Sequence, residues 1–371
     1  MKKLMRTIAV FLILMVLASC SSKDKKLNEQ DSSTQDGKTP ETAFNNTSNN
    51  DDLIDITVLA SKLSTPWSIQ KADDIFFISE RTGTIAVVEN GRVVHEKVNL
   101  QHPLSTAAEA GLLGFVLSPN FKENGEAFAY YTYEKNGKIF NRIILLQRSN
   151  GLWSEKNVLL DEIPSGAYHH GGRLKIGPDG KLYATTGDAV TPEIAQDVNS
   201  LGGKILRMNL DGSIPNDNPI ANNYMYSLGH RNPQGLAWSP EGKMYASEHG
   251  PSANDEINEI MPNRNYGWPL IIGTQKQQGL ISPLFTSGDG ETWAPSGMVY
   301  YQNALYVAVL KGTALLRFDL ENSRVERIVN NVGRIRDVWI EGTDLYFITN
   351  NTDGRGNPTG DDDQLMKISL N

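Results

Sequence analysis

The sequence predicts an all-β fold, a six-bladed β-propeller of four-stranded antiparallel blades. Amphipathic helical patterns are scarce, and turn residues separate short runs of β-branched and aromatic residues. One signature, a turn followed by a strand centred on an aromatic residue, recurs along the chain. Its copies lie 40 to 62 residues apart, which is about the length of one propeller blade.

The signature occurs six times, often with Asp-Gly or Glu-Gly in the turn, as in "PDGKLYATTG" and "PEGKMYASEHG". The aromatic positions are Phe77, Tyr130, Tyr183, Tyr245, Tyr306 and Tyr346. An irregular β-sandwich is the alternative, but six repeats with a matching turn and strand favour the propeller. Loops of all blades meet over the central channel of a propeller, so residues distant in sequence can share one site.

The first residues are predicted to be a signal peptide, over residues 1–19. Lys2, Lys3 and Arg6 precede the apolar run "IAVFLILMVLA", which is too short for a comfortable membrane span. The run ends in "LASC", which resembles a bacterial lipobox with cleavage before Cys20 and a lipid on its thiol. An ordinary secretory signal that ends at a cysteine is the alternative. We therefore expect an extracytoplasmic protein, anchored to the cell membrane as a lipoprotein.

Composition divides the rest of the chain in two. Residues 20–50 are polar and are expected to form a disordered tether, whereas residues 51–371 are expected to form the propeller domain. Cys20 is the only cysteine, which excludes disulfides within the chain and thiolate metal clusters. The net charge of −8, with no basic cluster, argues against a nucleic-acid partner.

The densest polar stretch contains "GHRNPQG", "EHGPSANDEIN" and "NYGWP". Asp255 and Glu256 offer hard oxygen ligands, and the Gly250–Pro251 turn can expose backbone carbonyls. Together with the carbonyl of Tyr266, such a ligand set suits Ca²⁺. From spacing alone, a solvated acidic loop followed by an aromatic turn is the alternative.

Several motifs in a fixed order resemble a known family. They are "GLLGFVLSPNF", "HHGGRLKIGPDGKLY", "GHRNPQGLAWSPEGKMYASEHGP", "DEIN", "NYGWP", "APSG" and "GRIRDV". Together they are similar to the soluble pyrroloquinoline quinone (PQQ)-dependent sugar dehydrogenases, the glucose/sorbosone or aldose sugar dehydrogenase family. The likeness covers about residues 63–370. It implies a six-bladed propeller with PQQ and Ca²⁺ as cofactors, which oxidises an aldose sugar at the anomeric carbon to a lactone.

The resemblance also implies a site for the three carboxylates of PQQ. Its motifs assign this site to Arg231, Asn232, Lys311, Arg334 and Arg336. Arginine suits this task because its planar fork fits a carboxylate. Residues 334 and 336 alternate along a predicted strand, so both side chains can point the same way, with Ile335 opposite.

Glu109 in "AAEAGLLGF" is a further cofactor candidate, since some family members carry a glutamine there. A carboxylate beside anionic PQQ would have to be protonated or to face the sugar or the metal. The family also places Ca²⁺ on the carbonyls of Gly250 and Pro251, with a calcium role for Glu256 and the carbonyl of Tyr266.

Sugar oxidation needs a base with a pKa near the working pH, which favours histidine. The family pattern of His, one variable residue, two small residues and Arg-Leu puts the base at His169. His170 then takes the variable position on the pocket rim. Asp188 in "TTGDA" matches the carboxylate that orients this histidine.

The loop after "NYGWP" reads "LIIGTQKQQG" and has no carboxylate, so a calcium pair that accompanies dimerisation in some relatives is not expected, and a monomer is. The motifs name no electron acceptor. Two other functions stay open: a calcium-dependent lactonase on a six-bladed propeller, and a non-enzymatic propeller lipoprotein that binds glycan or protein. A lactonase would not need four converging cations. A binding propeller would leave the pair of His169 and Asp188 unexplained.

Overall fold

The computed structural model describes residues 54–370, which are almost entirely β-strands and loops, as the sequence predicts. The predicted signal peptide, the tether and Cys20 lie outside the described residues. Two short helical segments occur among these described residues, α1 (Phe121–Asn124) and the 3₁₀ turn η1 (Pro192–Ala195). No helix of the described part is long and apolar enough to cross a membrane.

The strands form four sheets of four strands and one of eight. Three four-stranded sheets use four consecutive antiparallel strands each. The first holds β10 (Leu174–Ile176), β11 (Leu182–Thr186), β12 (Lys204–Met208) and β13 (Met225–Leu228). The second holds β14 (Pro233–Trp238), β15 (Met244–Glu248), β16 (Glu256–Ile260) and β17 (Phe285–Thr286). The third holds β18 (Pro295–Tyr301), β19 (Ala304–Val309), β20 (Ala314–Asp319) and β21 (Arg324–Val329).

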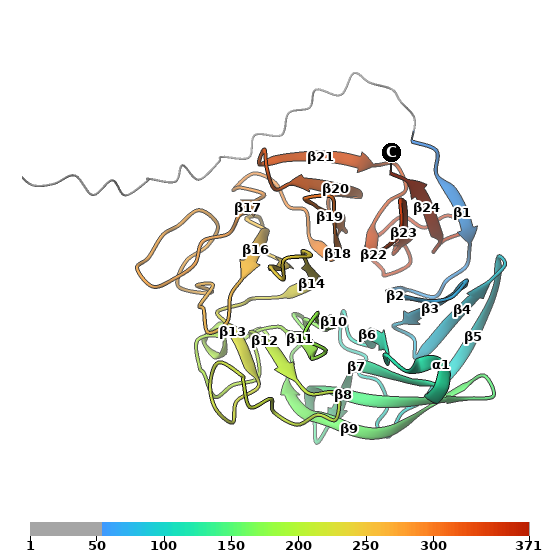
Figure 1. Cartoon of the computed structure of the whole chain (residues 1–371), viewed down its shortest axis with the longest axis horizontal. Helices are drawn as coiled ribbons and strands as arrows, with labels where there is room; N and C mark the ends of the chain where they lie inside the picture. The colour runs from blue at the N-terminus through green and yellow to red at the C-terminus, as the bar shows by residue number, and fades with distance from the viewer. Residues whose placement is uncertain (1–53, 371) are drawn as a thin grey trace, which may run out of the picture. The chain divides into compact units, whose positions relative to one another are not determined.

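The fourth sheet joins the two ends of the described chain (Figure 1). It holds β22 (Ile335–Glu341), β23 (Asp344–Thr349), β24 (Leu365–Ser369) and, at its edge, β1 (Thr57–Ala60). Strand β1 runs antiparallel to β24, with Thr57 opposite Lys367. An N-terminal strand therefore completes a sheet made from the C-terminal part of the chain.

The eight-stranded sheet consists of two antiparallel groups of four strands. The first group is β2 (Pro66–Ala72), β3 (Ile75–Glu80), β4 (Thr84–Glu89) and β5 (Arg92–Asn99). The second is β6 (Leu112–Leu117), β7 (Glu126–Lys135), β8 (Lys138–Ser149) and β9 (Leu152–Pro164). Only a short parallel pairing of β5 with β9 links the groups, with Val98 opposite Trp153 and Asn99 opposite Ser154.

The six repeated aromatic residues occupy equivalent places in this pattern. They lie in β3, β7, β11, β15, β19 and β23, each the second strand of a run of four. All six are buried, and each packs into an apolar cluster that it shares with the next strand group; Tyr183, for example, clusters with Leu236 and Ala246. The signature recurs because each group needs one large side chain to fill the gap to its neighbour.

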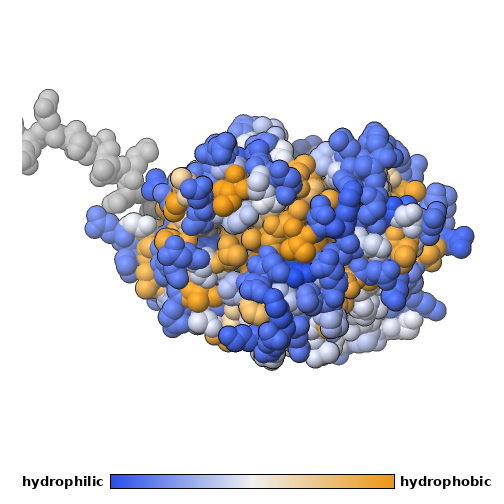
Figure 2. Space-filling model, turned by 90° about the horizontal axis from the view of Figure 1, so that it is seen from below, coloured by the Kyte–Doolittle hydropathy of each residue, from blue (hydrophilic) through white to orange (hydrophobic). Residues whose placement is uncertain are grey.

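The strand groups close into a ring (Figure 1). Strand β2 packs against β6, β6 against β10, β11 against β14, β14 against β18, β18 against β22, and β22 against β2. This closed series of antiparallel sheets is the arrangement of a β-propeller. Figure 2 shows one side of the ring, where an apolar area lies among polar residues.

A buried arginine ties the ring together across its centre. Nη1 of Arg173 lies 2.9 Å from Oδ2 of Asp337 in β22, and its Nε donates to the carbonyl of Gln234 in β14. Its guanidinium also lies 4.2 Å from the ring centroid of Trp67 in β2. Trp67 and Gln234 both line the cavity described next, so the contacts of Arg173 hold two of its lining residues in place.

Candidate active site

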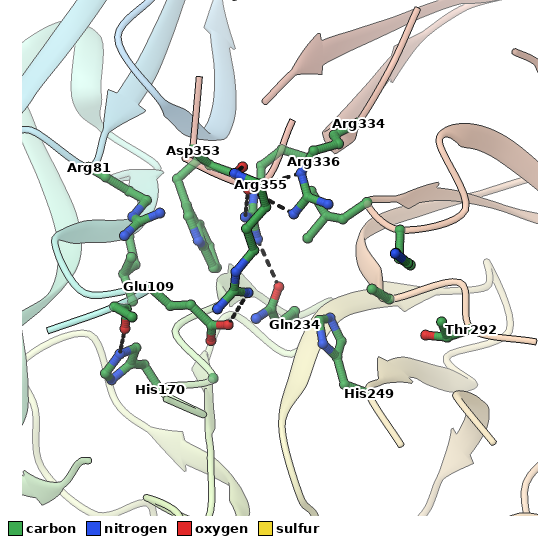
Figure 3. Close-up of a pocket in the computed structure, with 17 residues that line it drawn as sticks. Arg81, Glu109, His170, Gln234, His249, Thr292, Arg334, Arg336, Asp353 and Arg355 are labelled. Carbon is green, nitrogen blue, oxygen red and sulfur yellow. Dashed lines mark hydrogen bonds and ion pairs between the residues drawn. The ribbon is translucent and has the colours of Figure 1, made fainter. Parts of the chain in front are cut away.

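A polar cavity of about 350 Å³ lies between loops of several strand groups (Figure 3). Five cationic side chains and two carboxylates line it, which leaves an excess of three positive charges. They are Arg81, Lys311, Arg334, Arg336 and Arg355, against Glu109 and Asp353. Such an excess in a partly enclosed site attracts a ligand with several negative charges.

Arg334 and Arg336 reach the cavity from the same side of β22, while Ile335 packs in the core. Nε and Nη2 of Arg334 lie 3.1 and 2.8 Å from Oδ2 of Asp353. Arg336 donates to Asn350 and, through Nη1, to the side chain of Gln234. Burial disfavours the charged form of Arg336 and lowers its pKa to about 9. A bound anion would stabilise the charged guanidinium.

Glu109 lines the same cavity and pairs with a residue that the sequence did not point to. Its Oε1 lies 2.5 Å from Nη1 of Arg355, which follows β23. Burial opposes ionisation of Glu109, but the charge of Arg355 prevails and lowers its pKa to about 2. Glu109 is therefore ionised, and its carboxylate is paired with an arginine. Pairing with an arginine was not among the arrangements expected from the sequence.

His170 lines the cavity, and its side chain is fixed at both ring nitrogens. Nε2 lies 2.9 Å from the carbonyl of Ala108, and Nδ1 lies 2.7 Å from Oγ of Ser165. The carbonyl can only accept, so Nε2 carries the proton and Nδ1 accepts from the hydroxyl. The residue is 2% exposed, and burial lowers its pKa. The expectation that His170 sits on the rim is therefore wrong, because it is part of the wall.

His169 points elsewhere and contacts Asp188. Its Nδ1 lies 2.7 Å from Oδ1 of Asp188, whose Oδ2 accepts a 2.9 Å hydrogen bond from Nε1 of Trp268. Asp188 is fully buried, and Nε2 of His169 has no hydrogen-bond partner among residues 54–370. His169 is not among the residues that line the 350 Å³ cavity, although its neighbours His170 and Gly171 are.

The glycines after the histidines serve backbone packing. Gly171 and Gly172 have φ values of +63° and +98°, in the region that glycine favours. A Cβ on Gly171 would lie 2.6 Å from the carbonyl oxygen of Thr185 in β11. Gly171 lines the cavity and Gly172 does not, and both glycines let the segment pack closely against neighbouring residues.

The four predicted metal residues, Gly250, Pro251, Glu256 and Tyr266, line a second and smaller cavity. Glu248 also lines it and lies opposite Glu256 on the paired strands β15 and β16. Burial, reinforced by the charge of Glu248, raises the pKa of Glu256 to about 8. Within the described residues no three His, Cys, Asp or Glu side chains form a metal-binding cluster, so a cation here would depend on backbone carbonyls.

Both carboxylate oxygens of Asp255 accept hydrogen bonds from nearby residues. Its Oδ1 accepts from the backbone N–H of Gly250, and its Oδ2 accepts from Thr292 and from the backbone N–H groups of Trp293 and Ala294. These donors hold Asp255 against the turn at Gly250, and its Oδ1 accepts only one of them.

Neither Arg231 nor Asn232 lines the 350 Å³ cavity. Arg231 lines the smaller one, with its guanidinium 5.4 Å from the ring centroid of Trp268. Asn232 lines neither; its Oδ1 accepts a 3.0 Å hydrogen bond from the N–H of Gly171. His249 lines both cavities, and its Nε2 is buried without a partner among residues 54–370, as is Nε of Arg231.

Sequence reasoning missed several lining residues: Trp67, Arg81, Gln234, His249, Asp353 and Arg355. A signal existed for His249 and Gln234, which stand inside the motifs "EHGP" and "GHRNPQG". Arg81 and Arg355 stand in "SERTG" and "TDGRGNP", which look like ordinary polar turns until the fold brings them together.

The chain is an antiparallel propeller with a cation-rich cavity among its loops. Residues 63–359 match the Glucose / Sorbosone dehydrogenase family, and the chain belongs to this family. The resemblance seen in the sequence motifs is confirmed.

Named relatives agree with this assignment. The chain is 37% identical over 267 residues to Quinoprotein glucose dehydrogenase B of Acinetobacter calcoaceticus, covering 61% of this chain but 54% of that protein. It is 30% identical over 362 residues to Aldose sugar dehydrogenase YliI of Escherichia coli strain K12, covering 85% and 93%. The PQQ-bound form of Aldose Sugar Dehydrogenase from Streptomyces coelicolor superimposes with a TM-score of 0.79 at 33% identity, covering 85% and 98%. These named relatives are oxidoreductases that act on sugars.

Proposed function

We propose that this protein oxidises aldose sugars at the anomeric carbon to lactones, with PQQ and Ca²⁺ as cofactors. The observation that carries the proposal is the excess of three positive charges in the 350 Å³ cavity. PQQ carries three carboxylates, so its charge matches this excess. The Acinetobacter and Streptomyces relatives, by name a quinoprotein and a PQQ-bound enzyme, support the same choice.

The residues present fit PQQ in a second way. Buried polar atoms normally have partners, yet within the described part of the chain Nε of Arg231 and Nε2 of His249 have none. His249 lines both cavities and Arg231 lines the smaller one. Lys311, Arg334 and Arg336 would hold carboxylates, with Arg231 and Asn232 at the adjoining wall. When bound, PQQ would supply the acceptor for the hydride that leaves the sugar.

Calcium is proposed for the smaller cavity. The carbonyls of Gly250 and Pro251 would face the ion, with Glu256 and the carbonyl of Tyr266 completing an all-oxygen set of the kind Ca²⁺ prefers. A cation there would also favour the ionised form of Glu256, whose pKa burial and the nearby Glu248 raise to about 8.

His169 is proposed as the general base. The contact of its Nδ1 with Asp188 fixes the tautomer that leaves Nε2 unprotonated and free to accept the proton of the sugar hydroxyl. The imidazolium that forms is stabilised by Asp188, whose second oxygen is held by Trp268. Loss of this proton, together with departure of hydride from the same carbon, converts the anomeric C–OH into the lactone carbonyl.

Further proposals concern the whole chain. We propose that the four four-stranded sheets and the two halves of the eight-stranded sheet are the six blades of one propeller over residues 51–371. We also propose that the protein is a monomeric, extracytoplasmic lipoprotein attached to the membrane only through Cys20.

Reconstitution with PQQ and Ca²⁺ tests the function. The quinone absorbance of the bound cofactor should bleach when an aldose is added. A protein that binds no PQQ but hydrolyses sugar lactones would instead be a lactonase. A protein that does neither and retains glycan or protein ligands would be a binding propeller.

A further inference from the structure

The Glu109–Arg355 ion pair lies on the solvent side of the cavity. The side chain of Arg355 is 49% exposed and that of Glu109 is 24% exposed, whereas those of Arg334 and Arg336 deeper inside are 9% and 6% exposed. Figure 3 shows Arg355 reaching across the cavity toward Glu109. The two residues are 246 positions apart, on the loop before β6 and the loop after β23, so the pair joins two separate loops over the cavity.

Asp353 connects this pair to Arg334, which lies deeper in the cavity. One of its oxygens, Oδ2, binds the guanidinium of Arg334, and the other, Oδ1, accepts a 2.9 Å hydrogen bond from the backbone N–H of Arg355. The side chain of Asp353 is 3% exposed, and its two oxygens bond to Arg334 and to the backbone of Arg355. The loop that carries Arg355 is therefore attached at its base, while the side chain that spans the cavity extends from that base.

Other contacts of Arg355 are weak enough to let it move. Apart from Nη1, its guanidinium nitrogens have no hydrogen-bond partner among residues 54–370, and its nearest ring is that of Tyr168, with 5.8 Å to the centroid. Tyr168 itself is 43% exposed. Because about half of the Arg355 side chain is exposed, water can replace Glu109 as its partner when the pair opens.

We propose that the Glu109–Arg355 ion pair is a latch over the cofactor cavity, which must open for an anionic ligand to enter and which slows its release once bound. In this proposal Glu109 acts by holding Arg355 in place and does not contact the cofactor directly. That the ligand is PQQ rests on the proposed function.

Glu109→Gln separates this proposal from plain electrostatics. Glutamine keeps the shape but removes the charge that holds Arg355. If Glu109 only repelled the anionic ligand, its neutralisation would strengthen binding and slow release. A latch predicts the opposite for release: PQQ dissociates about threefold to tenfold faster from Glu109→Gln than from the parent, and association is also faster.

Stopped-flow fluorescence measures both rates on the full chain with Ca²⁺, using PQQ as the probe. Arg355→Ala should also release PQQ faster, and the exchanged pair E109R/R355E should restore slow release because it rebuilds the ion pair. The matched control is Glu162→Gln, which breaks another exposed ion pair of 2.5 Å, with Lys135, and should leave both rates unchanged. Parent-like or slower release from Glu109→Gln overturns the latch.

Hydrogen exchange of the cofactor-free protein tests the latch without PQQ. Amides of residues 353–357 should exchange faster in Glu109→Gln than in the parent, since the loop loses its partner across the cavity. If this occurs while the parent binds no PQQ, the latch stands and the proposed function fails. If exchange is unchanged, the latch fails, whatever the protein binds.

Discussion

Nδ1 of His169 lies 2.7 Å from Oδ1 of Asp188, while the adjacent His170 has both ring nitrogens occupied by Ala108 and Ser165. Two neighbouring histidines therefore differ in the property that matters for proton transfer. His169 keeps one nitrogen free and has a carboxylate to stabilise its protonated form. His170 would have to give up a buried hydrogen bond before it could accept a proton.

Replacement of His169 by alanine should abolish most sugar oxidation and spare cofactor binding. A positioned base contributes about 10²–10⁴ to the rate, so the quinone should bleach slower by that factor. PQQ affinity should change little, because the imidazole does not line the cation-rich cavity. Single-turnover bleaching by stopped flow measures the reductive step alone.

His170→Gln is the matched control for this experiment. Its amide can still bond to Ala108 or Ser165, so bleaching should stay within a few-fold of the parent. If His170→Gln loses bleaching and His169→Ala keeps it, the assignment of the base is reversed.

Cofactor capture should depend on the cations of the cavity. A hydrogen bond to a charged group contributes ~1.5–3 kcal/mol, and 1.4 kcal/mol corresponds to about tenfold in affinity. Lys311→Ala and Arg336→Ala should therefore each weaken PQQ binding by roughly tenfold to a hundredfold in a fluorescence titration. Arg324→Ala, at an exposed position of β21, should bind PQQ like the parent. Parent-like binding by both cavity variants would exclude this cavity as the PQQ site.

The sequence predicted the repeat pattern well because one large buried aromatic per strand group is a local requirement. It also placed Arg334 and Arg336 on one side of a strand, since alternation is a property of the strand itself. It could not show that Arg355 faces Glu109, because that contact joins loops 246 residues apart, and only the closure of the ring brings them together. The alignment of the histidine motif likewise could not show that both ring nitrogens of His170 are hydrogen-bonded.

Stability should fall in mild acid because His170 is buried in its neutral form. Burial lowers its folded pKa below the usual 6.5, so the unfolded chain binds the proton first as pH decreases. The stabilisation is fully present above about pH 6.5 and is lost as the pH falls toward the folded pKa, by at most ~1.4 kcal/mol per pH unit for one proton. Thermal unfolding between pH 8 and 5 should show a shallower decline for His170→Gln. His102→Gln, at a half-exposed histidine, should decline like the parent.

Membrane attachment should depend on Cys20, which lies outside the described residues. Cys20→Ser removes the thiol that would carry the lipid. The variant should move from the membrane to the soluble or secreted fraction, with unchanged activity per folded molecule. Fractionation followed by immunoblotting decides this, and a variant that stays with the membrane contradicts the lipoprotein proposal.

Calcium should stabilise the folded protein through the smaller cavity. A ligand that binds only the folded state stabilises it by RT ln(1 + [L]/Kd), which is about 2.7 kcal/mol at a hundredfold excess over Kd. The parent should therefore unfold at a higher temperature in Ca²⁺ than after chelation, even without PQQ. Glu256→Gln removes the one proposed side-chain ligand but keeps an acceptor for the N–H of Gly273, so it should lose most of this increase while folding normally. The control is Glu259→Gln on the same strand, which lines no part of this cavity and should respond to Ca²⁺ like the parent. An equal increase in all three proteins would place the calcium site elsewhere.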